Sequence, residues 1–507
     1  MEFTVHLMDL ISLPVLLKLL AVFLIYLVIL SGPRNIPPGK SKWNLIASFS
    51  FFTNFFKHQE ATMQRMTSKY GNIFSMYMGN QLVVFISGYD NIYQVLVKQA
   101  DVFSDRPTWL PYIKQMTKIG QGIIMNDGYS WKRLRQFTLQ NLRDFGMGKS
   151  LNEENIFIEI DALSKALTKK EEAVEIKPLI TCAISNVIHN VVFGFRFDYE
   201  DPEFLDIINT LNDIFRHPGI LNPFDYFPLG IGGLIPRAQQ LREQRKRVLT
   251  KLQSYVYNQI EEHEGSYDPN DIRDFVDLYI KASKEAKEAK DENDVFTKGN
   301  IFRVICDLFV AGSESTSTTL DWAFLYMIEY PDVQKKCQQE IQEVYGNKQI
   351  KYADRDKLKY VEATLMEIQR CATVGKVYIT FKCSACYQKK HKTLKGYFIP
   401  ENTVIITNLE SSNMDSKYWD NPKEFRPERF LDESGELVRN PAFLPFSTGK
   451  VCPGETFAKM EMFLVVTNLL QRFTFYRERE DCCHDLGRRC ASTVQPTPYK
   501  LRAIKRT

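Results

Sequence analysis

The chain has 507 residues, of which 44% are hydrophobic, 13% aromatic and 25% charged, a composition ordinary for a large globular protein. Its net charge is only +4 at pH 7, so bulk charge gives no indication of a nucleic-acid-binding protein.

The first predicted element is an apolar run from Leu10 to Leu30. A helix of this length just crosses a bilayer core of about 30 Å, while a cleaved secretory signal is the alternative. Basic residues follow the run and place the remainder of the chain in the cytoplasm, namely Arg34, Lys40 and Lys42. We therefore expect a membrane anchor over 1–31, a proline-containing linker over 32–44 and a globular domain over 45–507.

The next informative segment runs from Trp131 to Arg135 and reads WKRLR. It places an indole N–H donor and a guanidinium about one helical turn apart, a pair suited to binding a carboxylate. An amphipathic basic helix with a solvated face has the same pattern, so the segment alone leaves both interpretations open.

A long helix is predicted from Asn300 to Tyr330, because apolar residues recur there at helical spacing. Small and hydroxylated residues interrupt it at 311–316, where they are poor helix formers and indicate a function. Gly312 would let a ligand approach the backbone, and three neighbours offer polar groups, namely Glu314, Ser315 and Thr316. A kinked core helix is the alternative.

A second helix, predicted over 361–371, carries Glu367 and Arg370 on one face, three residues apart. Arg370 is expected to meet Glu428 or Arg429 in the proline-containing segment 425–430. The alternative for the Glu–Arg pair is an ordinary ion pair at the surface.

The segment 446–454 reads FSTGKVCPG and is followed by a third helix, predicted to start at Pro453 and to end near Phe473. Cys452 therefore lies near a helix N-terminus, where free N–H groups stabilise a thiolate. A single thiolate without a second protein ligand suits haem iron, and a small buried structural cysteine is the alternative. With few β-like runs (82–87 and 403–408), the chain is predicted to be mainly α-helical with a small sheet.

In this order and spacing, the motifs resemble the cytochrome P-450 superfamily, the haem-thiolate monooxygenases, and in particular its microsomal second family. The resemblance covers essentially the whole chain and rests on the anchor, the proline hinge and the segments SWKRLR, VAGSEST, EIQR, FRPERF and VCPGETFAKME. It implies the cytochrome P-450 fold and a haem b group, iron protoporphyrin IX, with an axial thiolate.

The resemblance also assigns roles to individual residues. Cys452 would be the axial thiolate and metal ligand, and Glu367, Arg370 and Arg429 would lock the core under the haem. Ser315 would deliver protons, with Glu314 and Thr316 beside it. The remaining cofactor-binding residues are expected to be Trp131, Arg135, Phe446, Gly449, Lys450 and Gly454.

Two segments depart from the family pattern. The interval from Phe446 to Cys452 is one residue short and lacks the family's arginine, which leaves Lys450 as the only cation. After Arg370, Lys376, Thr380 and Phe381 replace the expected prolines and a cationic residue. Each lost contact weakens haem anchoring by about 1.5–3 kcal/mol, so a non-catalytic or degenerate haem-binding membrane protein on the same fold is the alternative function.

The activity implied is insertion of one oxygen atom from O2 into a lipophilic substrate, such as a fatty acid, a steroid or a xenobiotic. Electrons would come from NADPH through the NADPH-cytochrome P-450 reductase, with cytochrome b5 as a second donor. The basic face of Lys132 and Arg133 is a candidate docking surface, and a merely solvated face is the alternative. The expected location is the endoplasmic reticulum membrane, with the catalytic domain on the cytoplasmic face.

Overall fold

The structure is a computed structural model of the 507-residue chain. It describes the following residues: 13–30, 35–39, 50–51, 55, 58–78, 81–106, 111–144, 150–169, 172–216, 235–375, 377–381, 393–479, 486–490 and 493–506. All structural statements below concern these residues.

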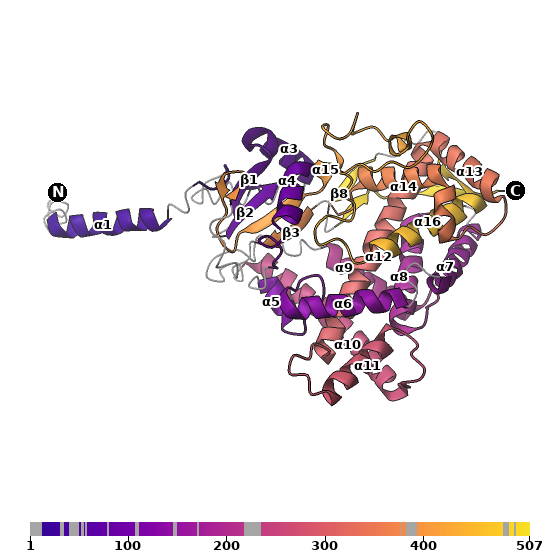
Figure 1. The fold of residues 1–507 in the computed structure, drawn as a ribbon, viewed down its shortest axis with the longest axis horizontal. Coiled ribbons are helices and arrows are strands. Elements are labelled where there is room, and N and C mark those ends of the chain that lie inside the picture. Colours follow the sequence, from indigo (N-terminus) through magenta and orange to yellow (C-terminus); the bar gives the residue numbers. More distant parts are fainter. Residues whose placement is uncertain are drawn as a thin grey trace.

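The described part of the chain is mainly helical, as predicted (Figure 1). The α-helices are α1 (Leu13–Leu30), α3 (Gln59–Tyr70), α4 (Tyr89–Tyr93), α5 (Pro111–Thr117), α6 (Gly128–Asp144), α7 (Ser150–Thr168), α8 (Ile176–Phe193), α9 (Pro202–Arg216), α10 (Pro236–Ser266), α11 (Phe275–Glu288), α12 (Lys298–Glu329), α13 (Pro331–Tyr345), α14 (Lys359–Ala372), α15 (Glu410–Asn413) and α16 (Glu455–Arg472). Shorter helical turns are η1 (Gln94–Lys98), η5 (Tyr352–Lys357) and η6 (Pro427–Phe430).

The largest described sheet has four strands in the order β1-β2-β6-β3. Its strands are β1 (Ile73–Met78), β2 (Gln81–Ile86), β3 (Val377–Phe381) and β6 (Val404–Asn408). β2 pairs with β6 in parallel, and the other two pairings are antiparallel. The smaller two-stranded pairs are β4 (Thr393–Leu394) with β5 (Tyr397–Phe398), β7 (Phe473–Arg477) with β10 (Leu501–Lys505), and β8 (Arg488–Cys490) with β9 (Val494–Pro496). The predicted strands at 82–87 and 403–408 are confirmed as β2 and β6.

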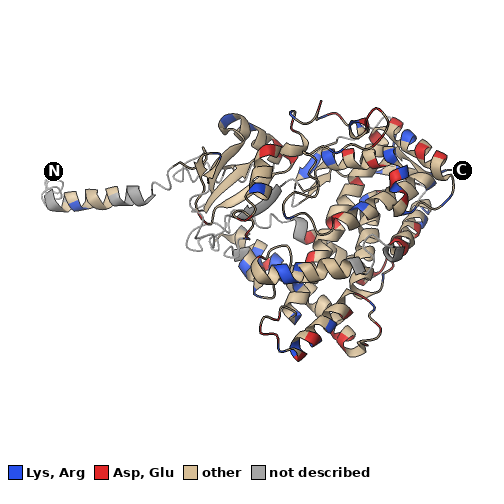
Figure 2. Cartoon of the chain, viewed as in Figure 1, with Lys and Arg blue, Asp and Glu red and all other residues tan. Residues whose placement is uncertain are grey.

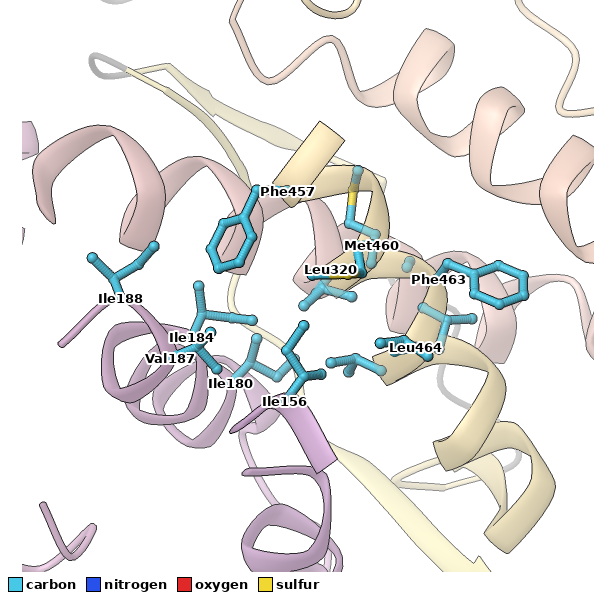
Figure 3. Close-up of a cluster of buried hydrophobic side chains, with 14 of the residues drawn as sticks. Ile156, Ile180, Ile184, Val187, Ile188, Leu320, Phe457, Met460, Phe463 and Leu464 are labelled. Carbon is cyan, nitrogen blue, oxygen red and sulfur yellow. The ribbon is translucent and has the colours of Figure 1, made fainter. Parts of the chain in front are cut away.

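Helix α12 passes through the centre of the globule, and α8 and α16 pack against it (Figure 1). Figure 3 shows the apolar side chains that fill the space between these helices, among them Ile184 of α8, Leu320 of α12 and Phe457 of α16. Thr297 precedes α12 and accepts a hydrogen bond from the Asn300 N–H at 3.2 Å. The long helix predicted from residue 300 to 330 is thus confirmed, and it forms the axis of the main core.

The helix after the cysteine begins slightly later than predicted. α16 starts at Glu455, whereas Pro453 and Gly454 form a turn before it. The first helical bond joins the Ala458 N–H to the Gly454 carbonyl at 2.9 Å, which makes Gly454 the N-cap. Cys452 therefore lies outside the helix rather than at its first turn.

The N-terminal helix α1 projects away from the globule (Figure 1), and its described leucine, valine and phenylalanine side chains are exposed. Within the described residues, one helix has the length and hydropathy of a membrane span, Ile176–Phe193, and 78% of it is buried inside the protein. That helix is α8, a core helix. A membrane span at α1 stays a prediction.

Candidate functional site

The cysteine loop closes through a short backbone contact in spite of its reduced length. The Cys452 N–H donates to the Phe446 carbonyl at 3.2 Å. Gly449 has a φ of +76°, and a Cβ there would lie 2.0 Å from the Leu96 carbonyl oxygen. Only glycine fits at this position, because a side chain would clash with the backbone and occupy an unfavourable conformation.

Cys452 presents an exposed thiol immediately before α16. The surrounding protein desolvates the sulfur and raises its pKa, although the Gly454 N–H lowers it. The expected stabilisation of a thiolate by the helix start is therefore outweighed by the desolvation of the sulfur. The polypeptide alone favours the thiol, and binding to a metal cation is the interaction that would hold a thiolate here.

Phe446 and Gly454 are two further residues of this loop that were predicted to bind the cofactor. The half-buried Phe446 ring packs against the main core, with Lys459 Nζ 5.5 Å from its centroid. A Cβ at Gly454 would lie 4.0 Å from Cys452 Sγ, an ordinary contact. Gly454 therefore contributes its N–H to the sulfur, and a side chain would also fit at this position.

Three cationic side chains meet beside this loop. Lys450 Nζ lies 3.9 Å from the Trp131 ring centroid and donates to the Ser104 carbonyl at 3.0 Å. Arg135 Nη2 donates to the Val451 carbonyl at 2.7 Å. Burial lowers the pKa of Lys450, the positive charges of Arg106 and Arg135 lower it further, and the carboxylates of Asp105 and Asp127 raise it in part. Like charges gathered in this way make the cluster a candidate anion site.

The structure therefore brings the predicted carboxylate-binding residues together, with two differences. The Trp131 indole N–H donates to the Ile123 carbonyl at 3.2 Å rather than pointing at an unpaired position. Arg106, which the sequence reading missed, joins the cluster, with its Nε donating to the Ile124 carbonyl at 3.0 Å. A lone arginine before a proline carries no periodic signal, so only the fold identifies it.

An uncovered strip runs along the middle of α12. Ala311 and Ser315 are exposed, whereas nearly all other residues of the helix from 300 to 328 are buried or half-buried. The Ser315 hydroxyl donates to the Ala311 carbonyl at 2.6 Å. Residues four apart lie on one helical face, so the strip is a single surface that the polypeptide leaves available to a ligand.

Glu314 points to a different, buried polar cluster. Its Oε1 accepts hydrogen bonds from Thr318 at 2.8 Å, Thr493 at 3.0 Å and Gln495 at 2.7 Å. Lys177 Nζ lies 3.6 Å from its Oε2, and burial lowers the pKa of this lysine although Glu314 raises it. The carboxylate is thus already bound by other groups, and Ser315 is not among its described partners.

Thr316 and Gly312 also face away from the strip. Thr316 is buried and turned towards Glu461 of α16, a fully buried carboxyl group that finds no hydrogen bond within normal geometry. Desolvation raises the pKa of Glu461 well above its ordinary value, although the Thr316 hydroxyl lowers it. A Cβ at Gly312 would lie 2.8 Å from Ile188 Cδ1. Gly312 therefore allows α8 to approach α12, and the expected contact with a ligand is replaced by helix packing.

The predicted Glu–Arg pair is fully buried, so the surface interpretation is wrong. Arg370 forms two hydrogen bonds with Glu367, at 2.7 and 2.8 Å, and Arg429 Nε donates to Glu367 at 2.9 Å. Arg370 also donates to backbone carbonyls of the segment 413–424. Glu428 instead pairs with Lys336 at the surface, at 2.8 Å. The expected contact of Arg370 with the segment 425–430 is therefore indirect, since Arg370 and Arg429 both bind Glu367.

The second departure from the family pattern falls partly outside the described residues, since Lys376 lies there. Thr380 and Phe381 belong to β3, which pairs with β6 in the four-stranded sheet. The described part of the segment that lacks prolines, residues 377–381, is therefore a regular strand.

Comparison with known proteins identifies the family. The Cytochrome P450 family model matches residues 37–503. The chain is 36% identical to Cytochrome P450 2B19 of Mus musculus over 511 residues, covering 98% of this chain and 99% of that protein. It is 36% identical to Cytochrome P450 2U1 of Mus musculus, covering 88% and 83%, and 34% identical to Cytochrome P450 2J2 of Homo sapiens, covering 93% and 92%. The chain therefore belongs to the cytochrome P450 family, monooxygenases that bind haem b through a cysteine thiolate.

Proposed function

We propose that the chain is a membrane-anchored monooxygenase that inserts one oxygen atom from O2 into lipophilic organic substrates, with electrons derived from NADPH. The observation that carries this proposal is the accessible Cys452 thiol, in a loop whose turn requires glycine at position 449. Haem b supplies the oxygen-activating chemistry when it is bound to such a thiolate.

The described residues fit haem b at three points. Cys452 offers a single thiol with no second protein ligand nearby, as a porphyrin iron requires. The cluster of Arg106, Arg135 and Lys450 offers positive charge to carboxylates. The uncovered strip of α12 supplies an apolar and hydroxylated face for a flat group and a substrate. We assign the metal to Cys452 and the propionates to this cationic cluster, with Trp131 within it and Phe446, Gly449 and Gly454 shaping the loop.

We assign proton delivery to Ser315, because its hydroxyl lies on the uncovered strip. Its Oγ carries a proton that forms a hydrogen bond to the Ala311 carbonyl. We propose that the hydroxyl redirects this hydrogen bond to a ligand bound at the strip. Glu314 and Thr316 adjoin Ser315 in the sequence but face away from the strip, towards Lys177 and Glu461, so we assign them supporting roles only. Serine lacks the β-methyl group that restricts χ1 in threonine, so this donor is less firmly aimed.

The proposed location is the endoplasmic reticulum membrane, with the catalytic domain on the cytoplasmic face. The apolar helix α1 and the basic residues that follow it in the sequence support this topology. Exposed Lys132 and Arg133 on α6 lie within a group of basic residues on α5 and α6 (Figure 2). This surface is proposed to receive the acidic face of NADPH-cytochrome P-450 reductase, with cytochrome b5 as a second donor.

The proposed substrates are fatty acids, steroids or xenobiotics. Phe309 packs against His189 and Phe193 of α8, with ring centroids 5.7 and 5.8 Å apart, and so is not available to a substrate. The α12 face available to a substrate is therefore formed by the exposed Ala311 and Ser315 with the half-buried Leu308. This face is apolar apart from one hydroxyl and favours lipophilic molecules.

The test is the spectrum of the reduced protein with carbon monoxide. The wild-type protein should show the red-shifted Soret band of thiolate ligation, and Cys452→Ala should abolish it. Turnover is then measured with arachidonate, a steroid and an alkoxy-aromatic compound in the presence of the reductase and NADPH. A wild-type band at the position of neutral ligation would overturn the proposal in favour of the non-catalytic alternative, which the missing loop arginine favours.

A further inference from the structure

The segment between α5 and α6 is fastened to α12 along its backbone. The Gln121 N–H donates to Asn300 Oδ1 at 2.6 Å, and a Cβ at Gly120 would lie 1.9 Å from the Gly299 carbonyl oxygen. A Cβ at Gly122 would likewise meet the Asp307 carboxylate, at 2.1 Å. Glycine at these two positions allows the segment to lie directly on α12.

Asp307 is the main polar contact of α12 with this segment. Its Oδ2 accepts hydrogen bonds from two successive backbone amides, Ile123 at 2.7 Å and Ile124 at 3.0 Å. Its Oδ1 accepts from Arg303 at 2.7 Å, and both side chains are almost fully buried. The carboxylate is therefore fixed in orientation and fixes the segment in turn.

The carbonyl groups of the same two residues face the candidate cofactor site. The Ile123 carbonyl accepts from the Trp131 indole, and the Ile124 carbonyl accepts from Arg106 Nε. The Trp131 ring in turn lies under Lys450 Nζ, 3.9 Å from the ammonium nitrogen. A continuous chain of contacts thus runs from Asp307 through Ile123 and Trp131 to Lys450.

We propose that Asp307 is a positioning residue for Lys450: by holding the Ile123 backbone it keeps the Trp131 ring under the lysine, which binds an anionic group of the cofactor. This inference rests on the proposed function, since it takes the cationic cluster to bind the haem carboxylates. A lysine contributes a point charge without the two-pronged geometry of an arginine, so its aim depends on the ring beneath it. A second branch passes through Ile124 to Arg106.

The experiment is a double-mutant cycle on the purified full-length holoprotein. Haem release into excess apomyoglobin is timed for the wild type, Asp307→Asn, Lys450→Ala and the double variant. Asparagine keeps the size of the side chain but presents only one acceptor oxygen, so it cannot hold both amides and Arg303.

Asp307→Asn should accelerate haem release about tenfold when Lys450 is present, the size expected for a charge-assisted hydrogen bond. In the Lys450→Ala background the acceleration should fall to about threefold, the remainder acting through Arg106. Equal acceleration in both backgrounds would overturn the inference, because a general loss of stability acts regardless of Lys450.

The matched control is Glu340→Gln. Glu340 also accepts hydrogen bonds from two successive backbone amides, Tyr360 at 2.8 Å and Val361 at 2.9 Å, in a different region. The Glu340→Gln variant should lower the thermal midpoint, and its effect on haem release should be the same with and without Lys450. If Asp307→Asn yields no folded protein, Trp131→Phe tests the chain from its other end, since it removes the N–H donor to Ile123. Its effect on haem release should likewise shrink in the Lys450→Ala background, and an unchanged effect would overturn the inference.

The reduced carbon monoxide spectrum of each variant separates the two claims. A thiolate band in the wild type without coupling between Asp307 and Lys450 would overturn only this inference. A wild type without that band would sink the proposed function.

Discussion

Two groups of charged side chains in this protein differ sharply in how they are held. The Glu367 group, which comprises Glu367, Arg370 and Arg429, is buried and joined by three hydrogen bonds between 2.7 and 2.9 Å. The cation cluster, which comprises Arg106, Arg135 and Lys450, is only partly buried, and the side-chain contacts described for it are mainly single bonds to backbone carbonyls. The first group is centred on a carboxylate that accepts bonds from both arginines, whereas in the second the positive charges of Arg106 and Arg135 lower the pKa of Lys450 and the charges of Asp105 and Asp127 oppose them only in part.

The difference separates folding from cofactor binding. A buried ion pair with all its hydrogen bonds formed is costly to break, because removal of one partner leaves a buried unpaired charge. Like charges that gather in one place favour a ligand of opposite sign, even where carboxylates such as Asp105 and Asp127 offset part of the charge. Lys450 of the shortened loop belongs to the cation cluster. We therefore expect the shortening of the loop to weaken haem retention rather than the stability of the fold.

The largest effect is expected for Arg370→Lys. Lysine cannot reproduce the paired hydrogen bonds of the guanidinium and leaves the Glu367 carboxylate and several carbonyls unsatisfied, at about 3–5 kcal/mol. Little folded haem protein should accumulate, as measured by soluble yield and by the carbon monoxide band.

Its control is Lys336→Ala, which removes the surface partner of Glu428 at 2.8 Å. Both side chains of this pair are about half exposed, so the thermal midpoint should hardly change. A wild-type midpoint for Arg370→Lys would remove the distinction between the two groups.

A gain is expected when an arginine is inserted between Lys450 and Val451. The insertion restores the loop length and adds a two-pronged donor to the cation cluster, a contact of about 1.5–3 kcal/mol. Haem occupancy should rise and haem release should slow, without movement of the thiolate Soret band. An alanine inserted at the same position is the control. Equal gains from both insertions would show that length, rather than charge, is what the loop lacks.

A smaller, purely catalytic effect is expected at Ser315. Ser315→Ala should leave haem occupancy unchanged and raise the ratio of peroxide to oxidised product by about tenfold or more, because the proton donor is lost. Ser315→Thr should lower this ratio through its stiffer rotamer. Thr319→Ala serves as the control, since its hydroxyl merely donates to the Ser315 carbonyl at 2.9 Å. Peroxide formation unchanged in Ser315→Ala would transfer the proton role to another group.

The smallest effect on the haem site is expected at His263, which lies apart from both charge groups. Its Nδ1 faces the Gln259 carbonyl at 2.7 Å and its Nε2 faces Asp274 at 2.8 Å. Burial lowers its pKa, but the hydrogen bond and charge of Asp274 outweigh this, so the pKa is raised above 6.5. The stabilisation is fully present below pH 6.5 and is lost as the pH rises through the raised value.

His263→Gln should therefore lower the thermal midpoint more at about pH 6 than at about pH 9, with a loss of about 1.5–3 kcal/mol at the lower pH. The rate of haem release should stay as in the wild type. A midpoint difference that does not depend on pH would mean that the folded protein holds this imidazole neutral.

Local spacing predicted what depends on a single helix. The apolar period fixed α12 and α14, and the interval of three residues placed Glu367 and Arg370 on one face. The segment 413–430 packs against α14, buries this pair and adds the hydrogen bond of Arg429 to Glu367. No local pattern contains that information.

The same limit explains the residues whose surroundings differ from the prediction. The sequence marked Gly312 as a point of close approach, but only the packing of α8 shows that Ile188 is what approaches. Glu314 and Ser315 are adjacent in sequence, yet about 100° of helical rotation separates them, so one joins Lys177 and the other the uncovered strip. Asp307 and Arg106 are connected to the site by hydrogen bonds to residues 123 and 124, in the segment between α5 and α6. No periodicity in the sequence predicts the course of that segment.

The pairing of Val83 in β2 with Val404 in β6 has a consequence for how the protein is made. While the ribosome is still producing the middle of the chain, the apolar edge of β2 has no partner, and such an edge invites association with other chains. Contacts between distant parts of a chain also form slowly. Cys452 is translated only after β6, so the sheet can close before the haem ligand exists. We therefore expect newly made chains to need protection of this edge during translation, and haem to be needed only at its end.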